Sequence, residues 1–335
     1  MLWKRSVWQY KWRKLAHVLA AQIAYVRLYA RVKVQKWQQP NDTLIGILLA
    51  EHLGDIVAAE PIIDALIKKF SNAKITWIIK PAFRALLENH PKIDSLIDEP
   101  SVLFSMYVSK KHPFDVFYNL HMNDLRSDAY FPGRFLVNPK ATELGLTKAN
   151  YLSHFNLLEV VSQLADLGKM TGYPHIYLEK DTKNSDLRKP YWVIHRKSNA
   201  QMRDWQDHLW CQLLDQILAE NDIDVVEIGV IEPLTYHSPK FQSLVGKTSL
   251  NETLRIVRDA EFFIGVESGP AHIANAFRIP ALILCGRFVN FDRYNVYSGA
   301  YQNDGIAQIV FNPTGTASEL TFEDVYAQLP QKNLA

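Results

Sequence analysis

The segment 265–276 carries the residue types in this chain most able to do chemistry. It places four of them close together: Glu267, Ser268, Gly269 and His272. Apolar residues before the segment predict a buried strand, and those after it predict a helix whose first-turn amides carry partial positive charge. Such a corner can bind a phosphate or diphosphate. An ordinary strand-to-helix turn, capped by Ser268 and with Pro270 in its first turn, is the alternative.

A second polar group follows the first apolar segment of the chain. Residues 44–50 predict a buried strand, and His52, Gly54 and Asp55 come directly after it. Ligands bind beyond the carboxyl ends of the strands in an open parallel sheet. Asp55 is therefore in position to accept a proton from an attacking hydroxyl, and Gly54 permits close approach of a substrate. The alternative is that Asp55 only caps the following helix.

Alternating strands and helices provide the scaffold for these residues. In the first half, we expect strands at 44–50, 74–79, 95–97 and 114–120, and helices at 56–70, 83–89 and 155–167. In the second half, we expect strands at 191–195, 223–228, 261–266 and 281–285, and helices at 205–220, 250–259, 271–277 and 321–329. This alternation is typical of parallel α/β units. The polar residues 121–150 are expected to form ligand-binding loops.

Length and composition indicate two domains. The chain has 335 residues, 48% of them hydrophobic, and single cores stop growing at roughly 250 to 300 residues. Its two cysteines, Cys211 and Cys285, have no metal or redox spacing, which favours a reducing compartment. We divide the chain into a basic arm at 1–42, an α/β domain at 43–180, a linker at 181–190, a second α/β domain at 191–320, and a closing helix and tail at 321–335.

The arm is strongly basic and rich in tryptophan. Residues 1–40 contain nine Lys or Arg and no acid, and they include Trp3, Trp8, Trp12 and Trp37. The uncharged run at 15–26 is shorter than the roughly 20 residues that span a bilayer. A basic helix with interleaved aromatic residues is typical of attachment to an anionic membrane surface. Packing on the domain, RNA binding and a signal peptide are the alternatives, and the last is disfavoured because His17 and Gln22 interrupt the apolar run.

Residues 44–97 and 246–286 together resemble glycosyltransferase family 9, whose best-known members are the heptosyltransferases of lipopolysaccharide core synthesis. The similar segments are 47–55, 61–66, 75–83 and 90–94 in the first half, and 246–252, 265–276 and 279–286 in the second. The resemblance implies a GT-B fold, in which two Rossmann-like doubly wound domains face a central cleft. The first domain would bind the acceptor and the second the nucleotide-sugar donor.

The resemblance also implies roles for single residues. Asp55 matches the general base of an inverting reaction that needs no divalent metal, because helix amides and basic side chains stabilise the departing diphosphate. The implied donor contacts are Ser198, Arg203, Glu232, Glu267, Ser268, Gly269 and His272. The residues that would meet the acceptor are His52, Gly54, His121, Asn123, Arg126 and Arg134.

The chain departs from the family pattern in two places. Glu267 stands where the family usually has Asp, so its carboxylate is displaced by about one methylene. After residues 193–195 the family commonly shows Pro-Gly and then Lys-x-Trp, whereas this chain has Arg-Lys-Ser-Asn at 196–199 and then Arg203-Asp204-Trp205. A guanidinium at position 203 would bind phosphate bidentately, where lysine offers a point charge.

We therefore expect an inverting glycosyltransferase that transfers a sugar to lipopolysaccharide or a related envelope glycan. ADP-heptose is the expected donor and co-substrate, with no other cofactor and no nucleic-acid partner. The expected location is cytoplasmic and peripheral, on the inner face of the cytoplasmic membrane, with the arm holding the enzyme to the lipid. The alternatives are a nucleotide-sugar 2-epimerase of the same architecture and a non-catalytic protein that binds a nucleotide sugar or an envelope glycan.

Overall fold

A computed structural model describes residues 2–153, 155–179, 187–188 and 190–330, with side chains from residue 7 onward. Contacts divide the chain into two compact units. Unit 1 comprises Met1–Glu51, Ile62–Tyr151 and Glu159–Met170, and unit 2 comprises His52–Pro61, Leu152–Leu158 and Thr171–Ala335. Most of the predicted linker at 181–190 lies outside the described residues.

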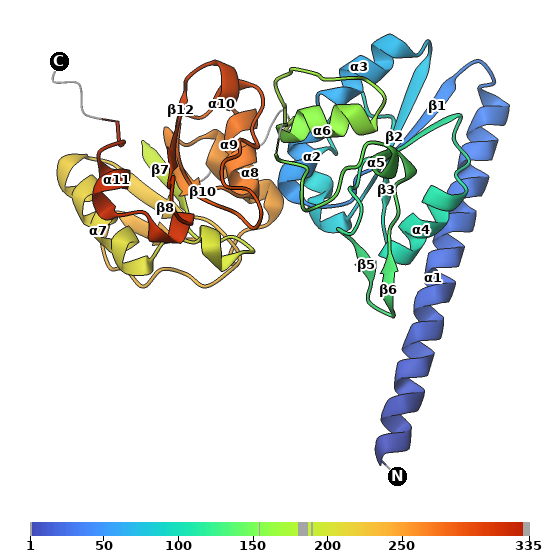
Figure 1. The fold of residues 1–335 in the computed structure, drawn as a ribbon, viewed down its shortest axis with the longest axis horizontal. Helices are drawn as coiled ribbons and strands as arrows, with labels where there is room; N and C mark the ends of the chain where they lie inside the picture. The colour runs from blue at the N-terminus through green and yellow to red at the C-terminus, as the bar shows by residue number, and fades with distance from the viewer. Residues whose placement is uncertain (1, 154, 180–186, 189, 331–335) are drawn as a thin grey trace. The chain divides into compact units, whose positions relative to one another are not determined.

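Unit 1 is built on a parallel sheet of four strands, drawn in Figure 1. The strands are β1 (Thr43–Leu48), β2 (Ala73–Ile79), β3 (Ser95–Asp98) and β4 (Val116–Asn119). Their order is β3-β2-β1-β4, so the chain leaves β1 toward β2 on one side and returns to pair with β1 through β4 on the other. The carboxyl ends of β1 and β4 therefore form a topological switch point, where open α/β sheets bind ligands.

The predicted helix at 56–70 is wrong as a single element. The chain forms two helices instead, α2 (Leu53–Ala59) and α3 (Ile62–Lys69). Pro61 separates them, because proline has no backbone N–H with which to continue the hydrogen bonds of α2. The break leaves α2 in unit 2 and α3 in unit 1.

The remaining elements of the first half are short. Residues predicted as a helix at 83–89 form a 3₁₀ helix, η1 (Pro81–Leu86), and the sequence pattern does not predict α4 (Val102–Lys110). The predicted loop region 121–150 contains an antiparallel pair, β5 (Ser127–Asp128) and β6 (Phe131–Phe135), and the one-turn helix α5 (Pro139–Glu143). The predicted helix at 155–167 is α6 (Leu157–Leu164).

Unit 2 contains a parallel sheet of six strands. These are β7 (Tyr191–His195), β8 (Asp224–Glu227), β9 (Phe241–Ser243), β10 (Phe262–Val266), β11 (Ala281–Cys285) and β12 (Ala307–Phe311). Read from β9, the order is β9-β8-β7-β10-β11-β12, which is the strand order of the dinucleotide-binding fold. Its switch point lies between β7 and β10.

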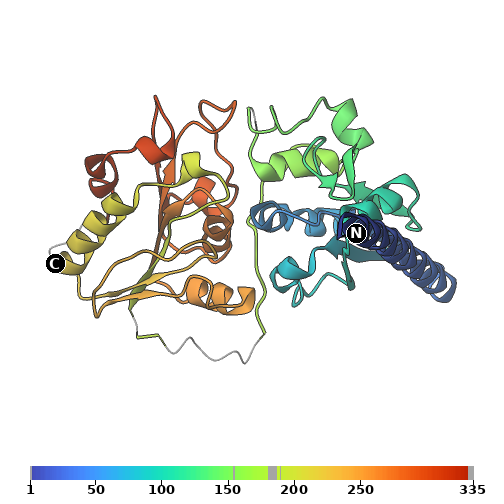
Figure 2. The ribbon, with the colours of Figure 1, turned by 90° about the horizontal axis from the view of Figure 1, so that it is seen from below.

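Helices cover both faces of the unit 2 sheet. They are α7 (Asp207–Glu220), α8 (Leu250–Arg258), α9 (Gly269–Ala276), α10 (Ala300–Asn303) and α11 (Phe322–Tyr326), with the 3₁₀ turns η2 (Gln201–Arg203) and η3 (Ala317–Glu319). Figures 1 and 2 show α7 and α11 on one face and α8 and α9 on the other. Trp205 and Trp210 anchor the first of these layers and are fully buried.

The arm forms one long helix, α1 (Leu2–Gln38), which packs on unit 1 beside α4, as Figure 1 shows. Ala21, Leu28 and Val32 are at most 3% exposed and share a core with β1 and α4. His17 bonds Asp128 at 2.9 Å, which ties α1 to β5. Packing on the domain, one of the four possibilities for the arm, is therefore observed for this face of the helix. Within the residues that the structure describes, no helix combines the length and apolar character needed to cross a bilayer.

Two leucines of α1 provide a test of this packing. Leu28→Ala should lower the free energy of unfolding by about 2 to 4 kcal/mol, because it leaves a cavity against α4. Leu19→Ala removes the same atoms from a side chain that is 47% exposed and should change the stability by less than about 0.5 kcal/mol. Urea titration of both variants measures the difference, and equal stabilities would mean that α1 is not docked on unit 1.

Candidate active site

The switch point of unit 2 is bridged by a buried histidine and a serine. His195 ends β7, and Ser268 follows β10. The Ser268 hydroxyl lies 2.9 Å from His195 Nδ1 and 3.0 Å from the carbonyl oxygen of Val266. Ser268 occupies the N-cap position of α9, but its side chain makes no capping hydrogen bond, so this part of the ordinary-turn alternative is wrong. The Ser268 side chain therefore leaves the amino-terminal end of α9 uncapped, which suits an anion.

Two glycines allow α2 to pack directly against α9 within unit 2. A Cβ atom added to Gly54 would lie 2.7 Å from Cδ2 of His272, and one added to Gly269 would lie 2.9 Å from Cδ2 of Leu53. No ordinary side chain fits at such separations. Gly54 and Gly269, predicted as acceptor and donor contacts, therefore have a packing role that the sequence analysis did not anticipate.

The contact between α2 and α9 brings Asp55 to the same corner. His52 is the N-cap of α2, so Asp55 is the third helical residue and not the cap itself. Its carboxylate accepts a hydrogen bond from the backbone of His52, which is half of a capping box. Asp55 is partly exposed, and desolvation by the surrounding protein raises its pKa, with a further increase from the charge of Glu267. His52 and Arg203 act in the opposite direction.

Arg203 and Glu267 bind each other. Nη1 of Arg203 lies 2.6 Å from Oε2 of Glu267, and Tyr294 donates a hydrogen bond of 3.1 Å to the same oxygen. The guanidinium also lies over the ring of Phe288, 4.4 Å from its centroid. Arg203 and Glu267 are two of the positions at which the chain departs from the family pattern. The side chains at the two departures therefore form an ion pair with each other.

Arg196 explains how the chain folds without the Pro-Gly loop of the resemblance. Its side chain is fully buried and bonds Oε1 of Glu227 and Oδ1 of Asp207, each at 2.6 Å, and the carbonyl oxygen of Glu232 at 2.9 Å. Glu227 also accepts the backbone amide of Leu234. Arg196 thus ties the end of β7 to the loop that follows β8.

The other predicted donor residues lie in the two loops that Arg196 joins. The Ser198 hydroxyl bonds Oδ1 of Asp204 at 2.8 Å, which closes the loop before η2. Glu232 is exposed and has a φ of 26°, a left-handed backbone conformation that is strained for a residue with a side chain. Because its carbonyl is held by Arg196, the backbone of Glu232 is fixed, while the residue is exposed to solvent.

Two buried histidines at the corner are held in the neutral form. Burial lowers the pKa of His195 to about 4, with a further contribution from Arg196. Burial lowers the pKa of His272 to about 4 as well; Glu267 opposes this effect. Both side chains are at most 6% exposed. A neutral imidazole at position 195 can accept a hydrogen bond from Ser268 or donate one to it without adding charge beside the turn at 265–276.

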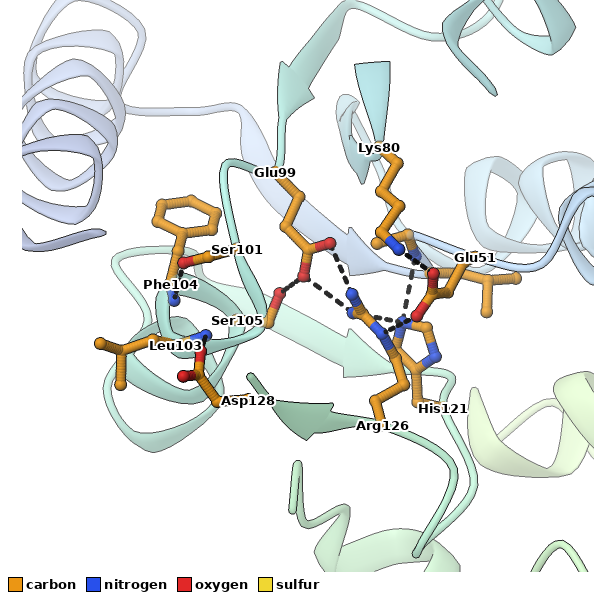
Figure 3. Close-up of polar contacts among 12 residues, drawn as sticks. Glu51, Lys80, Glu99, Ser101, Leu103, Phe104, Ser105, His121, Arg126 and Asp128 are labelled. Atoms are coloured by element: carbon orange, nitrogen blue, oxygen red, sulfur yellow. Dashed lines mark hydrogen bonds and ion pairs between the residues drawn. The ribbon is translucent and has the colours of Figure 1, made fainter. Parts of the chain in front are cut away.

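The switch point of unit 1 holds a buried ion network, drawn in Figure 3. Arg126 bonds both carboxylate oxygens of Glu99, at 2.8 and 2.6 Å, and Oε1 of Glu51 at 2.6 Å. Glu51 also pairs with Lys80, and these two cations outweigh burial to hold the pKa of Glu51 below its ordinary value. His121 Nε2 accepts the amide of Ala50 at 3.0 Å.

This network determines which charge faces solvent. The side chain of Arg126 is 1% exposed and is balanced by two carboxylates, whereas that of Lys80 is 39% exposed. Arg126 and His121, both predicted as acceptor contacts, are therefore buried, and they hold the residues that follow the strands in place. Lys80 is the cation of this network that is accessible to a ligand.

The remaining predicted acceptor residues are spread over the chain. Asn123 bonds Thr142 and the amide of Asn138, and it lines a hollow of about 290 Å³ between β6 and α5. Arg134 is exposed and lies over Phe131 at 5.2 Å. His52 is exposed at the start of α2 in unit 2. The structure therefore brings Arg126 and His121 together but does not collect all six residues at one place.

Several residues of these two sites were missed by the sequence analysis. Glu51, Lys80 and Glu99 each come just after a predicted strand, so the same rule that selected Asp55 points to them. Tyr294 lies in a segment without periodic pattern, and nothing local indicates that it reaches Glu267. In the described part of the chain, no cluster of three or more His, Cys, Asp or Glu is arranged to hold a metal ion.

Comparison with known proteins supports this description. Residues 158–288 match the family model of glycosyltransferase family 9 (heptosyltransferase). This segment contains the corner at 265–276 together with Arg196 and Arg203. No match was found among curated protein sequences. For this segment the match confirms the resemblance predicted from the motifs, and it supports a glycosyltransferase similar to family 9.

Solved structures share the fold at low sequence identity. A glycosyltransferase of family 9 from Veillonella parvula has a TM-score of 0.62 at 18% identity, over 86% of this chain and 96% of that chain. The E. coli ADP-heptose lps heptosyltransferase II has a TM-score of 0.60 at 15% identity, over 84% and 96%. E. coli heptosyltransferase WaaC with ADP-2-deoxy-2-fluoro heptose has a TM-score of 0.57 at 15% identity, over 85% and 98%. These likenesses confirm the predicted α/β fold of GT-B type.

Substitution of Gly54 tests the contact between α2 and α9. Gly54→Ala should cost about 1 to 3 kcal/mol of stability, because its Cβ overlaps the buried imidazole of His272. The double variant Gly54→Ala/His272→Ala should be less destabilised than the sum of the two single variants, since removal of the ring frees the space. Additive effects in a double-mutant cycle, measured by thermal unfolding, would show that the two helices do not touch at this point.

The two buried histidines predict a dependence of stability on pH. Between pH 6.5 and about 4 the unfolded chain binds more protons at these positions than the folded chain does, so the free energy of unfolding falls as the pH is lowered. Each histidine contributes about 3 kcal/mol across this window. The raised pKa of Asp55 acts in the opposite direction.

Variants separate these contributions. His272→Gln should flatten the decline of the unfolding temperature between pH 7 and pH 5, whereas His208→Gln, at an exposed position of α7, should leave it unchanged. The same slope in wild type and in His272→Gln would contradict a buried neutral imidazole.

Proposed function

We propose that this family 9-like glycosyltransferase transfers a heptose from ADP-heptose to lipopolysaccharide or a related envelope glycan, with inversion and without a divalent metal. The observation that carries the proposal is the position of Asp55, whose helix packs against the helix of the anion corner. A partly exposed carboxylate is thus held in the same unit as Arg203 and Glu267. The ADP-heptose-type donors named for the similar E. coli proteins support the choice of donor.

The proposed reaction is a direct displacement at the anomeric carbon. Asp55 accepts the proton of an acceptor hydroxyl. The oxygen of that hydroxyl attacks the anomeric carbon from the face opposite the diphosphate. A new carbon–oxygen bond forms, and the bond between the anomeric carbon and the diphosphate oxygen breaks. The nucleoside diphosphate leaves with the electron pair of that bond. One displacement inverts the configuration of the anomeric centre.

The proposed donor site supplies positive charge for the departing diphosphate. The positive end of the α9 dipole and the guanidinium of Arg203 are fixed in place before the reaction, so they need no reorganisation. Arg203 pairs with Glu267, which also accepts a hydrogen bond from Tyr294, and the buried ring of His272 packs against Gly54 of α2. Ser198, Glu232 and Gly269 complete the proposed donor contacts. Their charges and amides perform the role that a divalent cation has in other transferases.

We assign the acceptor to the carboxyl edge of the unit 1 sheet. Lys80 is the accessible cation there, and it suits an acceptor that carries phosphate or carboxylate groups. Arg126 and His121 hold this edge in shape, and Asn123 and Arg134 are the other proposed contacts in unit 1. The proposed acceptor contacts His52 and Gly54 belong to unit 2. We further propose that the enzyme works at the inner face of the cytoplasmic membrane, where a lipid-linked acceptor is confined and its effective concentration is raised.

Asp55→Asn tests the assignment of the general base. We expect turnover of ADP-heptose in the presence of a lipopolysaccharide acceptor to fall by at least about 100-fold, because the amide cannot accept the proton. The unfolding temperature should not fall, since the variant removes a carboxylate that is disfavoured in its charged form by burial. In the wild type, kcat/KM should decline as the pH is lowered through the raised pKa of Asp55.

Asp64→Asn is the matched control, because Asp64 is an exposed carboxylate of α3 paired with Lys92. It should retain wild-type turnover. GDP- and UDP-sugars serve as competing donors in the same assay, and reactions without acceptor detect an epimerase. Full activity of Asp55→Asn would remove Asp55 as base, and release of an isomerised nucleotide sugar without acceptor would overturn the transferase assignment.

A further inference from the structure

The outward face of α1 carries an apolar stripe that the fold of unit 1 leaves uncovered. The members of this outward stripe are Trp8, Trp12, Leu15, Leu19, Ile23, Val26, Val34 and Trp37. They recur mostly at intervals of three or four residues, which places them along one side of an α-helix. Their exposed fractions range from 47% for Leu15 and Leu19 to 82% for Trp37.

The opposite side of the same helix is already occupied. At 100° per residue, Ala21, Leu28 and Val32 lie on the side of α1 that faces away from the stripe, and they are buried against unit 1. Tyr25 donates a hydrogen bond to the carbonyl of Lys111, and Lys36 pairs with Asp115. The helix therefore has two apolar sides, of which the contacts with unit 1 use one.

The charges around the stripe indicate what covers it. Five basic side chains at exposed positions of α1 lie on its outer surface: Lys11, Arg13, Arg27, Arg31 and Lys33. The first acid in the chain is Asp42, so no carboxylate of α1 offsets them. A second copy of the helix would bring like charges together, whereas an anionic lipid surface offers opposite charge to the basic residues and hydrocarbon to the stripe.

The distribution of tryptophan agrees with a lipid interface. Trp8 and Trp12 lie toward one end of the stripe and Trp37 lies at the other end, and the indole ring favours the boundary between headgroups and acyl chains. The 37 residues of α1 form a helix about 55 Å long, so the stripe can lie flat along a membrane over many lipid headgroups.

We propose that the outward stripe docks α1 along an anionic lipid surface, while the inward side holds unit 1 to the helix. Because α1 is packed on unit 1, docking of the helix also fixes the orientation of unit 1 relative to the lipid surface. The inference rests on the proposed function only for the lipid-linked acceptor, and the docking itself is measurable without any sugar transfer.

The test uses the full-length chain and vesicles of phosphatidylcholine with or without 30% phosphatidylglycerol. Wild type should co-sediment with the anionic vesicles and not with the neutral ones. Leu19→Gln/Ile23→Gln should bind at least tenfold more weakly, because it places two amides in the centre of the stripe. Tryptophan emission should shift to the blue on binding, since Trp77, Trp192, Trp205 and Trp210 are already buried and the arm supplies the exposed rings.

The control is Ile67→Gln/Leu144→Gln, which changes two exposed aliphatic side chains of unit 1 outside α1. It should bind vesicles as wild type does. Both double variants should keep the wild-type unfolding temperature, and both should keep wild-type turnover of a soluble acceptor fragment. This last readout separates loss of docking from loss of the transferase reaction.

Three results would overturn the proposal. The first is equal vesicle binding by wild type and Leu19→Gln/Ile23→Gln. The second is dimerisation of wild type that this variant abolishes, with no binding to vesicles. The third is retention of RNA in place of anionic lipid. Vesicle binding without any sugar transfer would instead contradict the proposed function and leave the docking inference standing.

Discussion

The close approach of α2 to α9 is the constraint on which the candidate active site depends. Two glycines make it possible, because Gly54 meets the ring of His272 and Gly269 meets the side chain of Leu53. The first turns of two helices are thereby brought to one corner. One helix supplies a carboxylate that can accept a proton, and the other supplies amides that favour negative charge. A larger side chain at either glycine would separate these two chemical functions.

Charged residues around this corner differ from the pattern of the resemblance, and they form ion pairs that hold the local structure. Glu267 and Arg203 are both longer than the residues that the resemblance leads one to expect, and they bind each other at 2.6 Å. In place of the Pro-Gly turn, Arg196 has a buried guanidinium that bonds Glu227 of β8, Asp207 at the start of α7 and the carbonyl of Glu232 in the loop after β8. Arg196 and Glu227 are both buried, so removing Arg196 would leave the charge of Glu227 buried without its cation.

Unit 1 uses a similar network for a different purpose. Arg126 lies between Glu51 and Glu99 at the switch point of the sheet, so ion pairs add to apolar packing in holding the strand ends together. Lys80 is left with an accessible ammonium group. The helix α1 also has one buried and one exposed side: its inward residues complete the core of unit 1, and its outward apolar residues remain exposed.

The sequence alone determined the alternation of strands and helices and the parallel α/β class, because these follow from local periodicity. Residue types at strand ends made the turn at 265–276 and Asp55 candidates, and the family resemblance gave Asp55 its proposed role. The sequence did not determine that residues 56–70 break at Pro61, that Gly54 packs against His272, or that Arg203 reaches Glu267. The tertiary structure decided these points, as well as the burial of Arg126 and Arg196 and the two-sided character of α1. The physical reason is that burial and ion pairing depend on distances between elements remote in the chain, whereas periodicity reports only on neighbours within a few residues.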